Sequence, residues 1–171
     1  MARKPADVRM MNKAVHYLGR YSSSRHKLAQ VLQRFADRKL ADYDSQDIRA
    51  ALEQTLNQCA KLGYIDDWQF AVTTARRQRR LGRSQAVIRQ RLRQHALDDD
   101  TIMQALAQAD EGSIDADLQA AIRFAQRRRL GPFANRTSAS HQRHNPQKWR
   151  QRDLGAMARA GFSIATARKI I

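Results

Sequence analysis

Apolar residues recur at helical spacing along almost the whole chain of 171 residues, and no segment shows the clear alternation of a half-buried strand. After the first apolar stripe, Ser22-Ser23-Ser24 offers several N-cap residues for a second helix. The apolar positions of these two helices are Ala14, Tyr17, Leu18, Tyr21, Leu28, Val31, Leu32 and Phe35. The pattern predicts an all-α fold.

A third predicted helix begins at Asp44 or Ser45 and ends at a glycine. Gly63 is expected in the left-handed conformation that commonly ends helices. Tyr64 and Ile65 are then expected to turn back onto the core, and Asp66 or Asp67 to cap the next helix. The sequence therefore places a helix end, an apolar contact and a helix start within a few residues.

Similar local patterns return further along the chain. Residues 24–32 align with 84–92, residues 75–82 resemble 124–131, and residues 96–98 resemble 161–163. Such self-similarity is typical of helical repeat proteins. We therefore expect three tandem three-helix repeats that form an elongated, curved and basic array. The predicted parts are a flexible N-terminus 1–10, repeats 11–65, 66–111 and 112–171, and a flexible basic insertion at about 132–147 in the last repeat.

Acidic residues are absent from two long segments that are rich in arginine. No Asp or Glu occurs within 68–97 or within 118–152, although the formal net charge of the whole chain is +16. A one-sign field of this kind repels itself and favours a polyanion or an acidic protein surface as partner. On the helix near 67–81, Arg76, Arg79 and Arg80 are expected to project away from the buried side. The candidate binding residues are Arg76, Arg77, Arg79, Arg80, Arg89, Arg93, Arg127, Arg128, Arg129, Lys148 and Arg150.

Catalytic and metal-binding patterns are weak. The single cysteine, Cys59, lies in an apolar helical pattern and is expected to be a buried thiol, and one cysteine forms no intrachain disulfide. His141 and His144 lack further ligands nearby in sequence. No phosphate-binding loop or nucleophile motif is present. We expect no catalytic residues, no metal and no cofactor, and a cytoplasmic protein without a membrane span.

The segment 61–71, Lys-Leu-Gly-Tyr-Ile-Asp-Asp-Trp-Gln-Phe-Ala, is similar to the G-Y-[LI]-D-D-x-x-F-[AV] signature of the RecX family. The resemblance runs from about Ala14 onward, through residues 76–80 and 88–92, and ends at 159–163. Arg91 replaces an acid usual in the family, and the insertion at about 132–147 is longer than usual. Within the signature, the residues expected to be structural are Gly63, Tyr64, Asp66, Asp67 and Phe70.

The resemblance implies a non-catalytic negative regulator of the RecA recombinase. RecX-like proteins bind in the groove of the RecA–single-stranded-DNA filament, block its growth and suppress the ATPase, strand-exchange and coprotease activities of RecA. The implied partners are the RecA nucleoprotein filament and single-stranded and double-stranded DNA, and a monomer is expected. Charge alone also fits a general architectural or RNA-associated nucleic-acid-binding protein, and a nuclease or metal enzyme is a third class to be tested by DNA cleavage with Mg²⁺.

Overall fold

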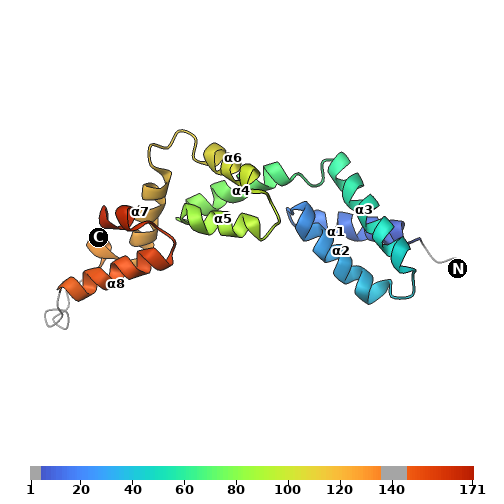
Figure 1. The fold of residues 1–171 in the computed structure, drawn as a ribbon, viewed down its shortest axis with the longest axis horizontal. Helices are drawn as coiled ribbons and strands as arrows, with labels where there is room; N and C mark the ends of the chain where they lie inside the picture. Colours follow the sequence, from blue (N-terminus) through green and yellow to red (C-terminus); the bar gives the residue numbers. More distant parts are fainter. Residues whose placement is uncertain (1–4, 136–145) are drawn as a thin grey trace. The chain divides into compact units, whose positions relative to one another are not determined.

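The computed structural model describes residues 5–135 and 146–171 (Figure 1), and these residues form helices and turns without a strand. The all-α prediction is therefore confirmed for the described chain. The helices are α1 (Ala6–Leu18), α2 (Arg25–Lys39), α3 (Ser45–Lys61), α4 (Asp67–Arg80), α5 (Gln85–Arg93), α6 (Asp99–Ala109), α7 (Ala116–Arg128), the 3-10 turn η1 (Gly131–Phe133), α8 (Pro146–Arg159) and α9 (Ile164–Arg168).

The chain divides into two compact units. The N-terminal unit comprises Met1–Ala71 together with His95–Leu97, and the C-terminal unit comprises Val72–Gln94 and Asp98–Ile171. The boundaries differ from the three repeats expected from the sequence, whose arrangement stays a prediction. The described part of the predicted insertion contains η1 and the start of α8, and residues 136–145 lie outside the described residues.

In the N-terminal unit, α1, α2 and α3 pack on one another around two apolar clusters. Helical structure begins at Ala6, earlier than the predicted first repeat, because Ala6, Met10 and Ala14 share one buried face. Cys59 is fully buried, and this burial raises the pKa of its thiol. The expected buried thiol is confirmed.

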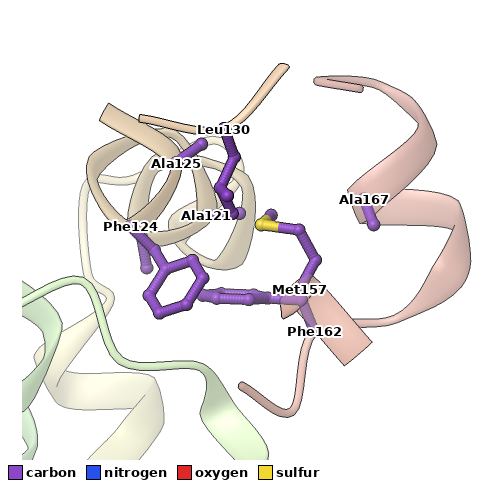
Figure 2. Packing of buried hydrophobic residues seen from close by; sticks show 8 residues of the cluster. Ala121, Phe124, Ala125, Leu130, Met157, Phe162 and Ala167 are labelled. Carbon is purple, nitrogen blue, oxygen red and sulfur yellow. The ribbon is translucent and has the colours of Figure 1, made fainter. Parts of the chain in front are cut away.

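The core of the C-terminal unit joins α7 to the helices at the end of the chain. Figure 2 shows the rings of Phe124 and Phe162 side by side, with the Met157 side chain reaching toward α7. The two ring centroids are 5.6 Å apart, within the usual range for aromatic pairs. The other buried members of this cluster are Ala120, Ala121, Ala125, Leu130 and Ala167.

The predicted turn after α3 is present. Gly63 has φ +70°, and the N–H groups of Gly63 and Tyr64 donate to the carbonyls of Ala60 and Cys59, as in a Schellman motif. Ile65 is buried as expected, but the Tyr64 side chain is 52% exposed, so the expected contact of Tyr64 with the core is wrong. In this motif the next residue, Ile65, supplies the apolar contact instead.

The two aspartates after this turn have different partners. Asp66 caps α4 by accepting a hydrogen bond from the Gln69 N–H at 2.9 Å. Asp67 accepts one from the Arg25 N–H at the start of α2, at 2.7 Å. Phe70 packs on the ring of His95, with centroids 4.7 Å apart. These contacts fit a structural role for this part of the signature.

The similarity of residues 96–98 to 161–163 is visible in the backbone. Ala96 and Gly161 both have positive φ, at 56° and 81°. Leu97 and Phe162, which follow them, are both buried. Asp98 and Ser163 then cap α6 and α9 through their side-chain oxygens. The local prediction from the repeated pattern is therefore confirmed at this turn.

Candidate arginine-rich binding surface

Helix α4 carries four arginines, and the structure divides them. Arg76, Arg77 and Arg80 are exposed, whereas Arg79 is only 8% exposed. Arg79 follows Ala75 by four residues, so it lies on the same side of the helix as the buried Ala75. The prediction that Arg79 projects away from the buried side is therefore wrong.

The Arg79 guanidinium is held by two carboxylates from distant parts of the C-terminal unit. It donates from Nε and Nη2 to Asp110 at 2.9 and 2.7 Å, and from Nη1 to Asp117 at 2.7 Å. Burial lowers the pKa of Arg79, but the hydrogen bonds to both carboxylates, and their charges, outweigh it and raise this pKa above its ordinary value. The bidentate contact with Asp110 orients the guanidinium.

This cluster connects several helix ends. Asp110 is the C-cap residue of α6, and Asp117 lies in the first turn of α7. Asp117 also accepts a hydrogen bond from the Gln85 N–H at the start of α5, at 2.8 Å. Because its donors are already bound, Arg79 acts as an internal support for the surface beside it.

A pocket of about 310 Å³ lies next to this cluster. Arg76 and Arg80 of α4 line it together with Arg123 of α7. The closest partner of Arg123 is the neutral Gln119 amide oxygen, at 3.4 Å. Sequence reasoning missed Arg123, although its place four residues before Arg127 in an acid-free segment could have revealed it.

The two candidate binding arginines of α5 are constrained by an ion pair and by partial burial. Arg93 is exposed but pairs with Asp99, with Nη2 and Oδ1 2.9 Å apart. The hydrogen bond and the opposite charge raise the pKa of Arg93 and lower that of Asp99. Arg89 is half-buried, so of these two candidate binding residues only Arg93 is exposed.

The remaining predicted residues lie on α7 and α8. Arg127, Arg128 and Arg129 are all exposed, and Arg129 ends α7 with φ 53°. Lys148 and Arg150 are exposed on α8. Trp149 between them is half-buried, and the Arg152 guanidinium carbon lies 5.1 Å from its ring centroid. This distance is that of a cation–π contact.

The N-terminal unit has a basic cleft of its own, which the sequence reasoning did not identify. The cleft has a volume of about 310 Å³ and lies against α1 and α2. Its lining residues are Lys13, Val31, Arg34, Phe35, Arg38 and Lys39. Asp37 interrupts this stretch in the sequence, so the stretch is not acid-free. The spacing of Arg34 and Arg38, one helical turn apart, was the available signal.

The described residues contain neither a metal-ligand cluster nor a membrane-spanning helix. Within residues 5–135 and 146–171, no three His, Cys, Asp or Glu side chains gather to hold a metal ion. His141 and His144 lie outside the described residues. None of the described helices is both long and apolar enough to cross a bilayer.

Comparison with known proteins was made on sequence and on structure. No family model matches the chain. The chain is 34% identical over 171 residues to the regulatory protein RecX of Myxococcus xanthus, with 99% of this chain and 87% of that protein covered. It is 26% identical over 161 residues to the regulatory protein RecX of Agrobacterium fabrum, with 94% and 80% covered.

The fold is similar to two solved structures. The crystal structure of RecX from Lactobacillus salivarius matches with a TM-score of 0.67 at 15% identity, covering 96% of this chain and 94% of that one. A second crystal structure, of a regulatory protein RecX, matches with a TM-score of 0.69 at 17% identity, covering 96% and 71%. At these identities the two structures support the fold alone. Membership of the family is shown by the 34% identity to the Myxococcus xanthus protein.

Proposed function

Because the chain belongs to the RecX family of regulatory proteins, we propose that it is a negative regulator of the RecA recombinase. It binds in the groove of the RecA–single-stranded-DNA filament and blocks filament growth. It thereby suppresses the ATPase, strand-exchange and coprotease activities of RecA. The observation that carries the proposal is the 34% identity to a RecX protein over nearly the whole chain.

The surface of the C-terminal unit supports this role physically. Eight of the predicted binding cations, on α4, α7 and α8, are exposed and have no carboxylate partner among the described residues. They are Arg76, Arg77, Arg80, Arg127, Arg128, Arg129, Lys148 and Arg150. Guanidinium groups bind carboxylates and phosphates in the same bidentate geometry. Such a surface suits a filament that presents both protein and DNA.

Three of the candidate arginines are less available to a partner than the others. They are Arg79, Arg89 and Arg93. The donors of Arg79 are bound to Asp110 and Asp117, so it supports the surface without contacting a partner. Asp99 already binds Nε and Nη2 of Arg93 and offsets its charge, and Arg89 is half-buried. The protein binds single-stranded and double-stranded DNA through phosphates, acts as a monomer in the cytoplasm, and performs no catalysis of its own.

The direct test is the DNA-dependent ATPase of RecA on single-stranded DNA as the protein is titrated in. Binding to the same DNA without RecA is measured at the same salt concentration. Inhibition well below the concentration that saturates naked DNA supports recognition of the filament. Inhibition only when free DNA is coated, or no inhibition, overturns the proposal and leaves a general nucleic-acid-binding protein.

A pair of charge-reversal variants locates the surface. The double variant Arg76→Glu, Arg80→Glu is expected to inhibit the RecA ATPase more weakly than the unaltered protein. Its helical circular-dichroism spectrum is expected to stay unchanged. Arg20→Glu with Arg49→Glu changes the net charge equally at exposed positions of the N-terminal unit and serves as the control. Equal inhibition by the two folded variants contradicts the assignment of α4 to the interface.

A further inference from the structure

We propose that the pocket between α4, the α6–α7 loop and α7 binds one phosphodiester group of a nucleic-acid strand. Arg76 and Arg80 approach from α4, Arg123 from α7, and the Ser113 hydroxyl from the loop. The assignment rests on the proposed function in so far as that function includes contact with DNA, and it names the site and the atoms that make the contact.

Uncompensated positive charge is the first observation. Five charged residues line the pocket, namely Arg76, Arg79, Arg80, Arg123 and Asp110. Asp110 and the adjacent Asp117 are both bound to Arg79. Among the described residues, no carboxylate pairs with the other three arginines. Like charges held around one cavity repel each other, and a bound anion removes that cost.

An unsatisfied hydroxyl is the second observation. The Oγ atom of Ser113 is inaccessible to solvent and has no hydrogen-bond partner among the described residues. Buried polar atoms without partners are rare because they lose their hydrogen bonds to water. When an anion occupies the pocket, the hydroxyl turns toward it and donates to one of its oxygens. Ligand binding therefore supplies the partner that the free protein lacks.

Rigid support for the arginines is the third observation. Arg76 and Arg80 flank Arg79, which Asp110 and Asp117 hold from the ends of α6 and α7. Gln119, one turn before Arg123 on α7, accepts a hydrogen bond from the Arg123 Nη2. The donors thus stand on helices whose ends are joined by a partly buried ion cluster. A preorganised set of donors loses less freedom when it binds.

The shape of the donor set favours phosphate over carboxylate. A carboxylate is planar, and one guanidinium can bind both of its oxygens within that plane. A phosphodiester is tetrahedral and accepts from several directions, as the convergence of two helices and a loop requires. The pocket volume of about 310 Å³ leaves room for a phosphodiester group and part of the adjoining sugar.

The test uses a fluorescently labelled oligothymidine and measures its affinity for the full-length protein by anisotropy over a range of NaCl concentrations. Arg123→Gln is expected to lower the affinity about tenfold. It also reduces the slope of log K against log salt by about 0.7, the value for one lost contact with single-stranded nucleic acid. Ser113→Ala is expected to lower the affinity about threefold without changing the slope, because a neutral hydroxyl releases no counterion.

Arg168→Gln on α9 is the matched control, since it removes an exposed arginine of the same unit that does not line the pocket. Its affinity and slope are expected to be close to those of the unaltered protein. Thermal melts followed by circular dichroism verify that all three variants are folded. A folded Arg123→Gln protein with an unchanged slope overturns the proposal, as does failure of the unaltered protein to bind oligothymidine at low salt.

Polyglutamate distinguishes a protein partner from a nucleic acid. If it binds the unaltered protein and loses this binding in Arg123→Gln, while the salt slope for oligothymidine stays the same, the pocket takes carboxylates and the phosphate assignment is wrong. RecA inhibition is measured separately on the same variants. Oligothymidine binding that depends on Arg123, without inhibition of RecA, refutes the proposed function and leaves the phosphate site intact.

Discussion

The arginine pocket of the C-terminal unit and the basic cleft of the N-terminal unit have the same volume of about 310 Å³, but their chemistry differs. In the arginine pocket, cations stand beside a carboxylate and other polar groups. In the basic cleft, four cations surround the apolar side chains of Val31 and Phe35, and no carboxylate lines the cavity.

The difference shows how charge becomes useful for recognition. Two aspartates hold Arg79 in the C-terminal unit, so the neighbouring arginines project from a supported helix. In the N-terminal unit, Arg34, Arg38 and Lys39 are exposed beside the apolar Val31 and Phe35, and long aliphatic stems of this kind can lie on apolar surface while their charges stay in water. Positive charge is abundant in both places, but only the arginine pocket has a carboxylate, that of Asp110, in its lining.

The largest expected effect comes from removing the support. Arg79→Met leaves Asp110 and Asp117 close together without their cation, and we expect the free energy of unfolding to fall by about 3 kcal/mol. Arg38→Met in the basic cleft should change it by less than about 0.5 kcal/mol. Urea denaturation followed by circular dichroism measures both. If both variants lost the same free energy of unfolding, Arg79 would be no more important for stability than an exposed arginine of the basic cleft.

A smaller effect is expected from two glycines, one in each unit. Gly161 has φ +81°, and a Cβ atom there would lie 2.6 Å from the Ser84 Oγ. Gly63 has φ +70°, with nothing within 4 Å of such an atom. Gly161→Ala should therefore cost about 2 kcal/mol, from backbone strain and the displaced serine, and Gly63→Ala about 1 kcal/mol, from strain alone.

The same denaturation experiments compare these two variants. If Gly63→Ala is the more destabilising, the turn after α3 makes contacts that the structure does not show. If neither variant differs from the unaltered protein, the left-handed conformation of both residues is contradicted.

A third prediction concerns ligand binding by the basic cleft. Arg34→Gln with Arg38→Gln should lower the affinity for oligothymidine only about twofold, because exposed cations act mainly through the general field of the protein. This affinity is measured by fluorescence anisotropy at one salt concentration. A loss larger than that of Arg123→Gln alone would make the basic cleft the stronger anion site.

The smallest effect concerns the exposed acids at the start of α6. Hydrogen bonds from the Thr101 N–H and hydroxyl lower the pKa of Asp98, and the hydrogen bond from Arg93 lowers that of Asp99. Because both pKa values lie below their unfolded values, the stabilisation is present above about pH 4 and is lost as the pH falls through the folded values. Carboxyl NMR titration measures each pKa.

Arg93→Gln is the discriminating variant for this prediction. It should raise the pKa of Asp99 toward its ordinary value and leave the pKa of Asp98 low, because Thr101 supplies the donors to Asp98. A parallel change at both aspartates would mean that the general positive field, rather than these specific contacts, lowers both values.

Local chemistry made much of the fold predictable. The helix end at Gly63, a cap at Asp66 or Asp67 and the similarity of the turns at Ala96 and Gly161 depend on residues a few positions apart, and each was expected. The structure assigns the cap to Asp66. The orientation of Tyr64 was not, because either of two successive residues could supply the apolar contact after the glycine. In the structure Ile65 is buried and makes this contact, whereas Tyr64 is exposed.

The binding surface was predictable only in outline. Acid-free segments identified the basic helices, and Arg76, Arg80, Arg127 and Arg128 are exposed as expected. Arg123 and Ser113 were not identified, since neither belongs to a recognisable motif. A pocket forms where chain segments meet, and the meeting of α4 with α7 cannot be read from either helix alone.

The amino-acid sequence by itself determined the helices, their caps and turns and the family to which the chain belongs, because these depend on neighbouring residues and on a contiguous signature. Only the tertiary structure decided which arginines are available to a partner. Arg79 has the same chemistry as Arg76 and Arg80, but its two acceptors lie 31 and 38 residues further along the chain. Folding brings those carboxylates to one arginine of the run, and among the described residues it leaves the neighbouring arginines without a carboxylate partner.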